Sequence, residues 1–139
     1  MQTKTARTIM RTVDVCLTTT MTLDKVSDQL SKHHLPGAPV LDENKLPVGF
    51  ISEYDCLKQL MESTYYCDNT YLAEDVMTKN LVSTNADISL IDLAQKMNES
   101  KLNVIAVIEN KELIGVISRG DVMRALVNDL ETCALSEAS

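Results

Sequence analysis

The apolar positions of this chain follow one pattern twice: an amphipathic helical stripe, two short apolar runs, and a second helical stripe. A spacing of i, i+3 and i+7 is typical of a helix face, and short apolar runs bounded by polar residues are typical of strands. The predicted helix faces and strands are Leu23/Val26/Leu30, 38–41 and 48–51, and then Leu90/Leu93/Met97, 104–108 and 113–117. A shorter strand precedes each of these helices, at 13–17 and 81–83. The pattern predicts a mixed α/β fold of the α+β type, with the order βαββα in each copy.

A direct repeat of the sequence supports this organisation. The segment Gly49-Phe-Ile-Ser52-Glu-Tyr-Asp55 returns as Gly115-Val-Ile-Ser118-Arg-Gly-Asp121, at an offset of 115 − 49 = 66. Upstream, Met10 corresponds to Met77 at an offset of 77 − 10 = 67, so the first copy has one extra residue in the turn before its glycine. Three strands cannot cover both faces of their own sheet. We therefore expect the two copies to pack sheet to sheet about an approximate twofold axis, with a groove lined by both.

The chain divides accordingly into an arm, two repeats and a tail. The predicted parts are an N-terminal arm with the first repeat (1–65), a polar linker (66–74), the second repeat (75–131) and a frayed C-terminal tail (132–139).

Composition excludes several classes of function. The formal charge is 13 − 20 = −7 without a basic stripe, which argues against nucleic acid as a partner. No apolar run approaches the roughly 20 residues of a membrane-spanning helix, and the first residues lack the apolar stretch of a secretory signal. The four cysteines form no CxxC motif, so we expect reduced thiols, no metal site and a cytoplasmic location. No nucleophile–base arrangement or Gly-rich phosphate loop indicates an enzyme.

The Ser-x-x-Asp motif at the start of each second helix is the candidate chemistry. A helix N-terminus carries partial positive charge and unpaired N–H groups, which favour a phosphate, and an ionised carboxylate can accept hydrogen bonds from both ribose hydroxyls. The same motif is also a capping box in which Ser52 or Ser118 caps its helix and the aspartate occupies N3. The two interpretations are compatible. Thr22 and Ser89 are the predicted N-caps of the first helices.

Together these features resemble the CBS domain, named after cystathionine β-synthase, and the pair resembles a Bateman module over about residues 8–131. The resemblance is carried by Met10 and Met77, the Leu35-Pro-Gly-Ala-Pro-Val-Leu41 segment, the Gly-x-Ile-Ser turn and the aspartate three residues beyond the serine. It implies that the cleft between the repeats binds AMP, ADP, ATP or S-adenosylmethionine. It also implies a role in sensing the energy state of the cell. It further implies that Asp55 and Asp121 accept from the ribose and that Ser52 and Ser118 meet the phosphate. The base pockets implied by the resemblance lie near Cys16, Ser83, Ala38 and Ile105.

The two copies differ at the residue after the serine. Arg119 can pair bidentately with a phosphate, whereas Glu53 repels one. We hypothesise that the Asp121 cleft binds a nucleotide more tightly than the Asp55 cleft.

The resulting hypothesis is a stand-alone regulatory module without catalytic activity. It senses an adenosine-containing ligand and signals to an unknown protein partner or through its oligomeric state. The resemblance implies a homodimer, for which the apolar stripes of the final helices are suited. The alternative is a ligand-independent module for dimerisation or protein interaction.

Overall fold

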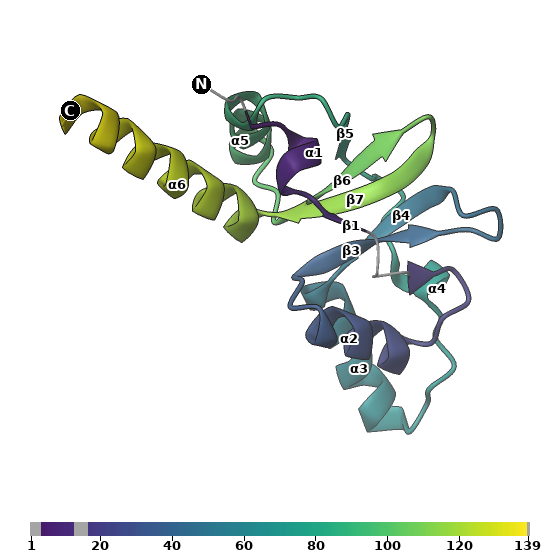
Figure 1. The fold of residues 1–139 in the computed structure, drawn as a ribbon. Coiled ribbons are helices and arrows are strands. Elements are labelled where there is room, and N and C mark those ends of the chain that lie inside the picture. The colour runs from purple at the N-terminus through teal and green to yellow at the C-terminus, as the bar shows by residue number, and fades with distance from the viewer. Residues whose placement is uncertain (1–3, 13–16, 139) are drawn as a thin grey trace.

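A computed structural model describes residues 4–12 and 17–138, and within them each repeat is one small sheet with two helices on its outer face (Figure 1). The first repeat contains β2 (Leu17–Thr18), α2 (Leu23–Lys32), β3 (Gly37–Leu41), β4 (Pro47–Ser52) and α3 (Glu53–Tyr66). The second repeat contains β5 (Ser83–Thr84), α5 (Leu90–Glu99), β6 (Val104–Glu109), β7 (Glu112–Ser118) and α6 (Arg119–Ala138). Shorter leading segments precede the repeats: α1 (Ala6–Ile9) and β1 (Arg11–Thr12) before the first, and α4 (Ala73–Val76) before the second. The predicted mixed α/β class and the βαββα order are confirmed.

The sheets have the same connectivity. The order is β2-β3-β4 in one sheet and β1-β7-β6-β5 in the other, with a parallel pair beside an antiparallel hairpin in each. The sheets face one another between the two helix layers (Figure 1). Val104 and Val116 of the second sheet belong to the same buried cluster as Val40 and Ile51 of the first. The predicted packing of sheet on sheet therefore places one continuous apolar layer between the repeats.

The first helix of each repeat forms where the apolar spacing predicts it. Helix α2 buries Leu23, Val26 and Leu30, and α5 buries the matching set of Leu90, Leu93 and Met97. Full burial of such a side chain contributes about 1.5–3 kcal/mol, so each stripe fixes its helix against the sheet. The Oγ atom of Ser89 accepts a hydrogen bond from the Asp92 backbone N–H at 3.2 Å, as predicted for an N-cap. Thr22 is an N-cap by position only, because its side chain makes no capping hydrogen bond.

Each leading segment packs on the repeat that it does not directly precede: α1 and β1 pack on the second repeat, and α4 packs on the first. The backbone N–H of Ala6 donates to the carbonyl of Ile88 in the second repeat at 3.0 Å, and β1 pairs antiparallel with β7. In the same way, the N–H of Ala73 donates to the carbonyl of Met21 in the first repeat at 2.8 Å. Ala6 and Ala73 are fully buried, each in the core of the opposite repeat. The predicted parts are divided by their order along the chain. In the folded protein, the two leading segments are exchanged, so that each packs on the other repeat.

Two glycines make this exchange sterically possible. A Cβ atom on Gly115 would lie 2.6 Å from the sulfur of Met10 and 2.8 Å from the carbonyl oxygen of Arg11. A Cβ atom on Gly49 would lie 2.5 Å from the sulfur of Met77 and 2.7 Å from the Thr78 carbonyl oxygen. The repeated glycine and the repeated methionine therefore contact each other, as Gly115 with Met10 and as Gly49 with Met77.

The C-terminal helix is longer than the sequence pattern suggests. Helix α6 continues to Ala138 and projects beyond the sheets, through the residues expected to form a frayed tail (Figure 1). No glycine or proline follows Gly120, so nothing in the sequence ends the helix. None of the helices in the described part of the chain is long and apolar enough to cross a membrane.

Replacement of Gly115 by alanine is expected to destabilise the protein by about 1–3 kcal/mol, because the new methyl group overlaps Met10 and the backbone of Arg11. Denaturant unfolding of the Gly115→Ala and Gly49→Ala variants measures this loss. Gly120→Ala is the matched control, since its Cβ would find its nearest neighbour at 3.4 Å at the start of a helix. Alanine is favoured over glycine there by up to about 1 kcal/mol. Equal effects at Gly115 and Gly120 would contradict the role of the glycine contact.

Candidate functional site

Both Ser-x-x-Asp motifs form complete capping boxes. The backbone N–H of Asp55 donates to Ser52 Oγ at 3.1 Å, and the N–H of Ser52 donates to Asp55 Oδ2 at 3.0 Å. At α6 the N–H of Asp121 donates to Ser118 Oγ at 3.2 Å, and the N–H of Ser118 donates to Asp121 Oδ2 at 2.9 Å. The capping interpretation is thus confirmed at both helix starts, and it holds each carboxylate close to the end of a strand.

The carboxylate of Asp121 is also held by two arginines. Arg11, which lies on the exchanged strand β1, donates from Nε to Oδ2 and from Nη2 to Oδ1, both at 3.1 Å. Its Nη1 donates to the carbonyl oxygen of His33 at 2.9 Å, at the end of α2 in the first repeat. Arg124, one turn along α6, donates to the same Oδ1 atom. Arg11 therefore joins the arm, the first repeat and the start of α6.

These contacts affect the ionisation of Asp121, whose side chain is only 10% exposed. Burial opposes the charged form. The hydrogen bonds from Arg11 and from Ser118, together with the positive charge of Arg11, outweigh that effect and hold the pKa of Asp121 below its ordinary value. The carboxylate is ionised at neutral pH and forms the centre of a charged cluster.

The corresponding position in the first repeat lacks this cluster. Thr78 pairs with Phe50 of β4 just as Arg11 pairs with Val116 of β7, so Thr78 is the counterpart of Arg11. Its hydroxyl donates to the Phe50 carbonyl oxygen at 3.4 Å. Among the described residues, no arginine or lysine forms an ion pair with Asp55. The two helix starts share their capping geometry and differ in charge.

A cavity of about 310 Å³ opens between the repeats at the start of α6. Its wall draws on the arm, the first repeat and the second repeat: Arg11, His34, Pro36, Asn103, Ser118, Arg119, Gly120 and Arg124. Asp121 lies directly behind this wall, bonded to three of its residues. Three arginines and a helix N-terminus line this one cavity, which makes it suited to an anionic ligand although the chain as a whole carries a charge of −7.

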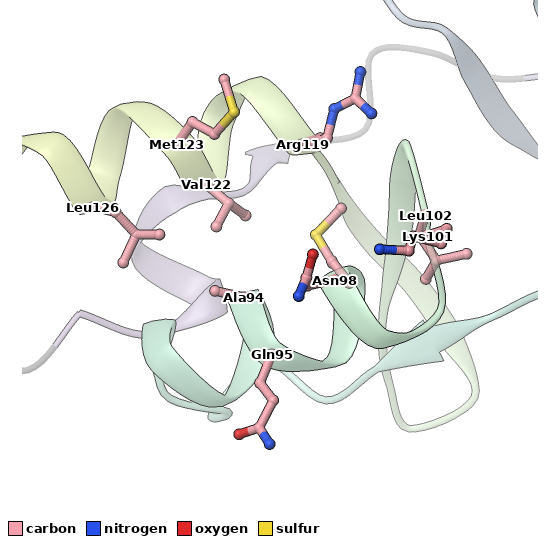
Figure 2. Close-up of a pocket in the computed structure, with 10 residues that line it drawn as sticks. Ala94, Gln95, Asn98, Lys101, Leu102, Arg119, Val122, Met123 and Leu126 are labelled. Carbon is pink, nitrogen blue, oxygen red and sulfur yellow. The ribbon is translucent and has the colours of Figure 1, made fainter.

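Larger cavities occur on the outer helical face and have a different character. One of about 580 Å³ lies between α5 and α6, where Val122 and Leu126 point toward Ala94 while Arg119 points away (Figure 2). Its counterpart of about 460 Å³ lies between α2 and α3. Apolar side chains predominate in both walls and neither capping aspartate lines them, so these cavities suit a protein surface better than a charged small molecule.

The residues predicted for the site fall into three groups. Ser118 and Arg119 line the cavity between the repeats, and Asp121 supports it. Ser52 and Asp55 form the equivalent helix start in the first repeat. The residues predicted for the base pockets line none of the three cavities described above. The carbonyl oxygen of Ser83 accepts from Lys96, and Ala38 and Ile105 are fully buried in the two cores. Cys16 lies outside the described residues, and the predicted contacts with a base remain predictions.

The sequence analysis missed Arg11, Arg124 and His34. Arg11 had a detectable signal, because the comparison that paired Met10 with Met77 also pairs Arg11 with Thr78, as it pairs Arg119 with Glu53. Both differences place an arginine at the α6 end. What the sequence did not contain was the exchange of leading segments that brings Arg11 to Asp121.

Other reactive side chains in the described part of the chain offer no competing site. The thiol of Cys56 is buried, and burial together with nearby Asp55 and Glu53 raises its pKa to about 11, so it is protonated at neutral pH. No group of three or more metal-ligating side chains forms a cluster among the residues described.

Comparison with known proteins agrees with this architecture. The family model for the CBS domain matches the chain twice, at residues 6–62 and 73–128. The chain belongs to the CBS domain family. The two matched segments correspond to the two repeats, each with its own leading segment, which confirms the resemblance seen in the sequence.

Individual relatives extend the comparison. The chain is 32% identical over 133 residues to the methylated protein MJ0556 of Methanocaldococcus jannaschii, covering 88% of this chain and 73% of that protein. It spans smaller shares, 18% to 56%, of three other curated relatives. The crystal structure of CBSX2 in complex with AMP superposes with a TM-score of 0.75 at 27% identity, covering 89% of this chain and 96% of that one. The CBS domain pair of MJ0100, in complex with 5-methylthioadenosine and S-adenosyl-L-methionine, gives a TM-score of 0.79 at 20% identity over 92% of this chain and 99% of its own.

The charged cluster predicts a pH-dependent contribution to stability. Asp121→Asn should lower the free energy of unfolding by about 1–3 kcal/mol at pH 7, because the amide cannot satisfy both arginines. The pKa of Asp121 is lower in the folded state, so its contribution is complete above the unfolded value of about 3.9 and is lost as the pH falls through the folded value. Urea unfolding between pH 3 and pH 7 should therefore show the wild type and the variant converging at low pH.

The matched control is Asp129→Asn, which removes an exposed ion pair to Lys4 and should cost less than about 1 kcal/mol. A difference between wild type and Asp121→Asn that stays constant over this pH range would show that the charge of Asp121 contributes nothing to folding.

Proposed function

We propose that the cavity at the start of α6 binds an adenosine nucleotide, and that binding regulates a partner protein or the assembly of the chain. The observation that carries this proposal is the convergence of Arg11, Arg119 and Arg124 on one helix start between the repeats. Arginine pairs bidentately with phosphate, and the first N–H groups of a helix favour the same anion. The volume of about 310 Å³ lies at the lower end of the range for small-molecule pockets.

The same charges favour AMP, ADP or ATP over S-adenosylmethionine. A nucleotide brings at least two negative charges to the three arginines, whereas the sulfonium ligand carries a positive centre that they repel. The complexes of CBSX2 with AMP and of MJ0100 with 5-methylthioadenosine and S-adenosyl-L-methionine establish both ligand types for those proteins. For this chain, the charge of the cavity supports the phosphate-bearing type.

The helical faces support a role in assembly. Apolar side chains are exposed along α3 and α6 at equivalent positions, Leu57 and Met61 matching Met123 and Val127 at an offset of 66. Such stripes beside the two apolar cavities suit a second copy of the chain, which would present the same surface. We therefore propose a homodimer as the form in which the module acts, without catalytic activity of its own.

Removal of Arg119 is expected to weaken AMP binding about tenfold or more, because a charge-assisted contact to phosphate is lost. Isothermal titration calorimetry with AMP and ATP on Arg119→Met measures the change. Glu53→Gln, at the equivalent position of the first repeat, is the control and should leave the affinity within about twofold. Asp121→Ala should also weaken AMP binding more than Asp55→Ala. A larger loss for Asp55→Ala would mean that the two ends have been assigned the wrong way round.

Introduction of charge on the helical face should separate the proposed dimer. Met123→Asp combined with Leu57→Asp places carboxylates at equivalent exposed positions, where a self-complementary contact brings like charges together. Native mass spectrometry should report a dimer for the wild type and a monomer for the double variant. The control is Lys25→Asp on α2, an exposed charged position outside the stripes. A wild-type monomer would remove the proposed dimer while leaving the ligand site in place.

The ligand-independent alternative makes a different prediction. A ligand present at 100 times its dissociation constant stabilises the folded state by about 2.7 kcal/mol. A thermal-shift panel tests AMP, ADP, ATP and S-adenosylmethionine in this way. If none of them raises the unfolding temperature of a protein that is dimeric, the result would favour a module that serves only assembly.

A further inference from the structure

We infer that Arg11 determines ligand specificity: it holds the carboxylate of Asp121 in this structure and passes to the phosphate when a nucleotide's ribose binds there. The inference rests on the proposed function and deepens it, because it names the chemical group that a ligand must carry. A phosphate-bearing adenosine compound can release Asp121 from Arg11, and a phosphate-free one cannot do so without leaving a cation unpaired.

The acceptor positions of Asp121 are already filled. An ionised carboxylate offers about four lone-pair positions. Those of Asp121 receive one hydrogen bond from the backbone of Ser118, two from Arg11 and one from Arg124. A ribose that donates its two hydroxyls to this carboxylate must therefore displace some of these protein donors. Arg11 contributes both of the 3.1 Å bonds that lie side by side, so it is the group that has to move.

The cost of moving Arg11 depends on what replaces its partner. The Arg11 side chain is 35% exposed, and apart from Asp121 the only acceptor it has among the described residues is the carbonyl oxygen of His33. A guanidinium deprived of its carboxylate in this half-buried place loses two charge-assisted hydrogen bonds. Arg11 also lines the cavity shared by Arg119 and Arg124, where a phosphate would lie. A phosphate offers Arg11 a bidentate anionic partner in exchange for the carboxylate, whereas adenosine offers none.

Among the described residues, this pairing of an arginine on a leading segment with a capping aspartate occurs at one end of the cleft only. Thr78 takes the place of Arg11 at the first repeat and reaches only the backbone of Phe50. Asp55 accepts a hydrogen bond from the backbone of Ser52 and forms no ion pair among the described residues. The preference for phosphate that Arg11 imposes therefore belongs to the Asp121 end.

The test compares AMP with adenosine, which differ only in the phosphate. Isothermal titration calorimetry is carried out with the full chain as wild type, as Arg11→Met and as Arg11→Gln, the second being a neutral side chain that still donates to an acceptor. In the wild type AMP should bind at least about tenfold more tightly than adenosine. In Arg11→Met, adenosine should bind at least about tenfold more tightly than it does to the wild type, because two acceptor positions of Asp121 are then free for the ribose. In Arg11→Gln the gain should be smaller, because the amide can still donate to the carboxylate. The affinity for AMP should change less, because AMP loses the contact between its phosphate and Arg11 while its ribose gains access to the Asp121 carboxylate.

Thr78→Val is the control, because it changes the equivalent position at the other end and should leave both affinities unchanged. Adenosine binding that does not strengthen in either Arg11 variant, while the wild type binds AMP, would overturn the inference and leave the proposed function standing. A loss of AMP affinity with unchanged adenosine affinity would do the same, since Arg11 would then be a simple phosphate contact. Failure of the wild type to bind either compound would overturn the proposed function itself.

Discussion

The packing of each leading segment on the opposite repeat is the constraint on which the rest of the structure depends. Gly49 and Gly115 leave just enough room for Met77 and Met10 to cross them, with no space for a Cβ atom. Three strands cannot cover both faces of their own sheet. Each repeat therefore has its core completed by a buried segment from the other, Ala73 in the first and Ala6 in the second. The same crossing delivers Arg11 to a carboxylate that lies 110 residues away in the sequence.

Corresponding residues of the two repeats agree where they are packed in the interior and differ where they are exposed to solvent. Buried stripes, capping boxes and crossing glycines agree between the repeats. The more exposed positions around the helix starts do not agree. Arg11 corresponds to Thr78, and Arg119 corresponds to Glu53. A core residue is fixed by the volume around it, whereas a residue at the rim of a cleft is limited mainly by charge. One symmetric scaffold thereby carries two chemically different ends.

The sequence predicted those features that depend on local spacing. Helices over Leu23–Lys32 and Leu90–Glu99 follow from their apolar stripes, and the capping boxes at Ser52 and Ser118 follow from residues three positions apart. It did not predict the exchange of leading segments, because nothing in the spacing near Met10 says which repeat it contacts. The cluster around Asp121 was missed for the same reason. It needs a pairing between β1 and β7 that is visible only once both sheets are formed.

The position of Asp121 beside Arg11 and Arg124 also balances the charge of the cavity wall. Three arginines that line a cavity of about 310 Å³ would repel one another without a nearby anion. Asp121 supplies that anion, and its own burial is offset by Arg11, Arg124 and the backbone of Ser118. The carboxylate that the family resemblance assigns to the ribose is thus the counter-ion of Arg11 and Arg124 in this structure. A ligand that uses this carboxylate for its sugar must bring an anion of its own, and the phosphate of a nucleotide meets both requirements in one molecule.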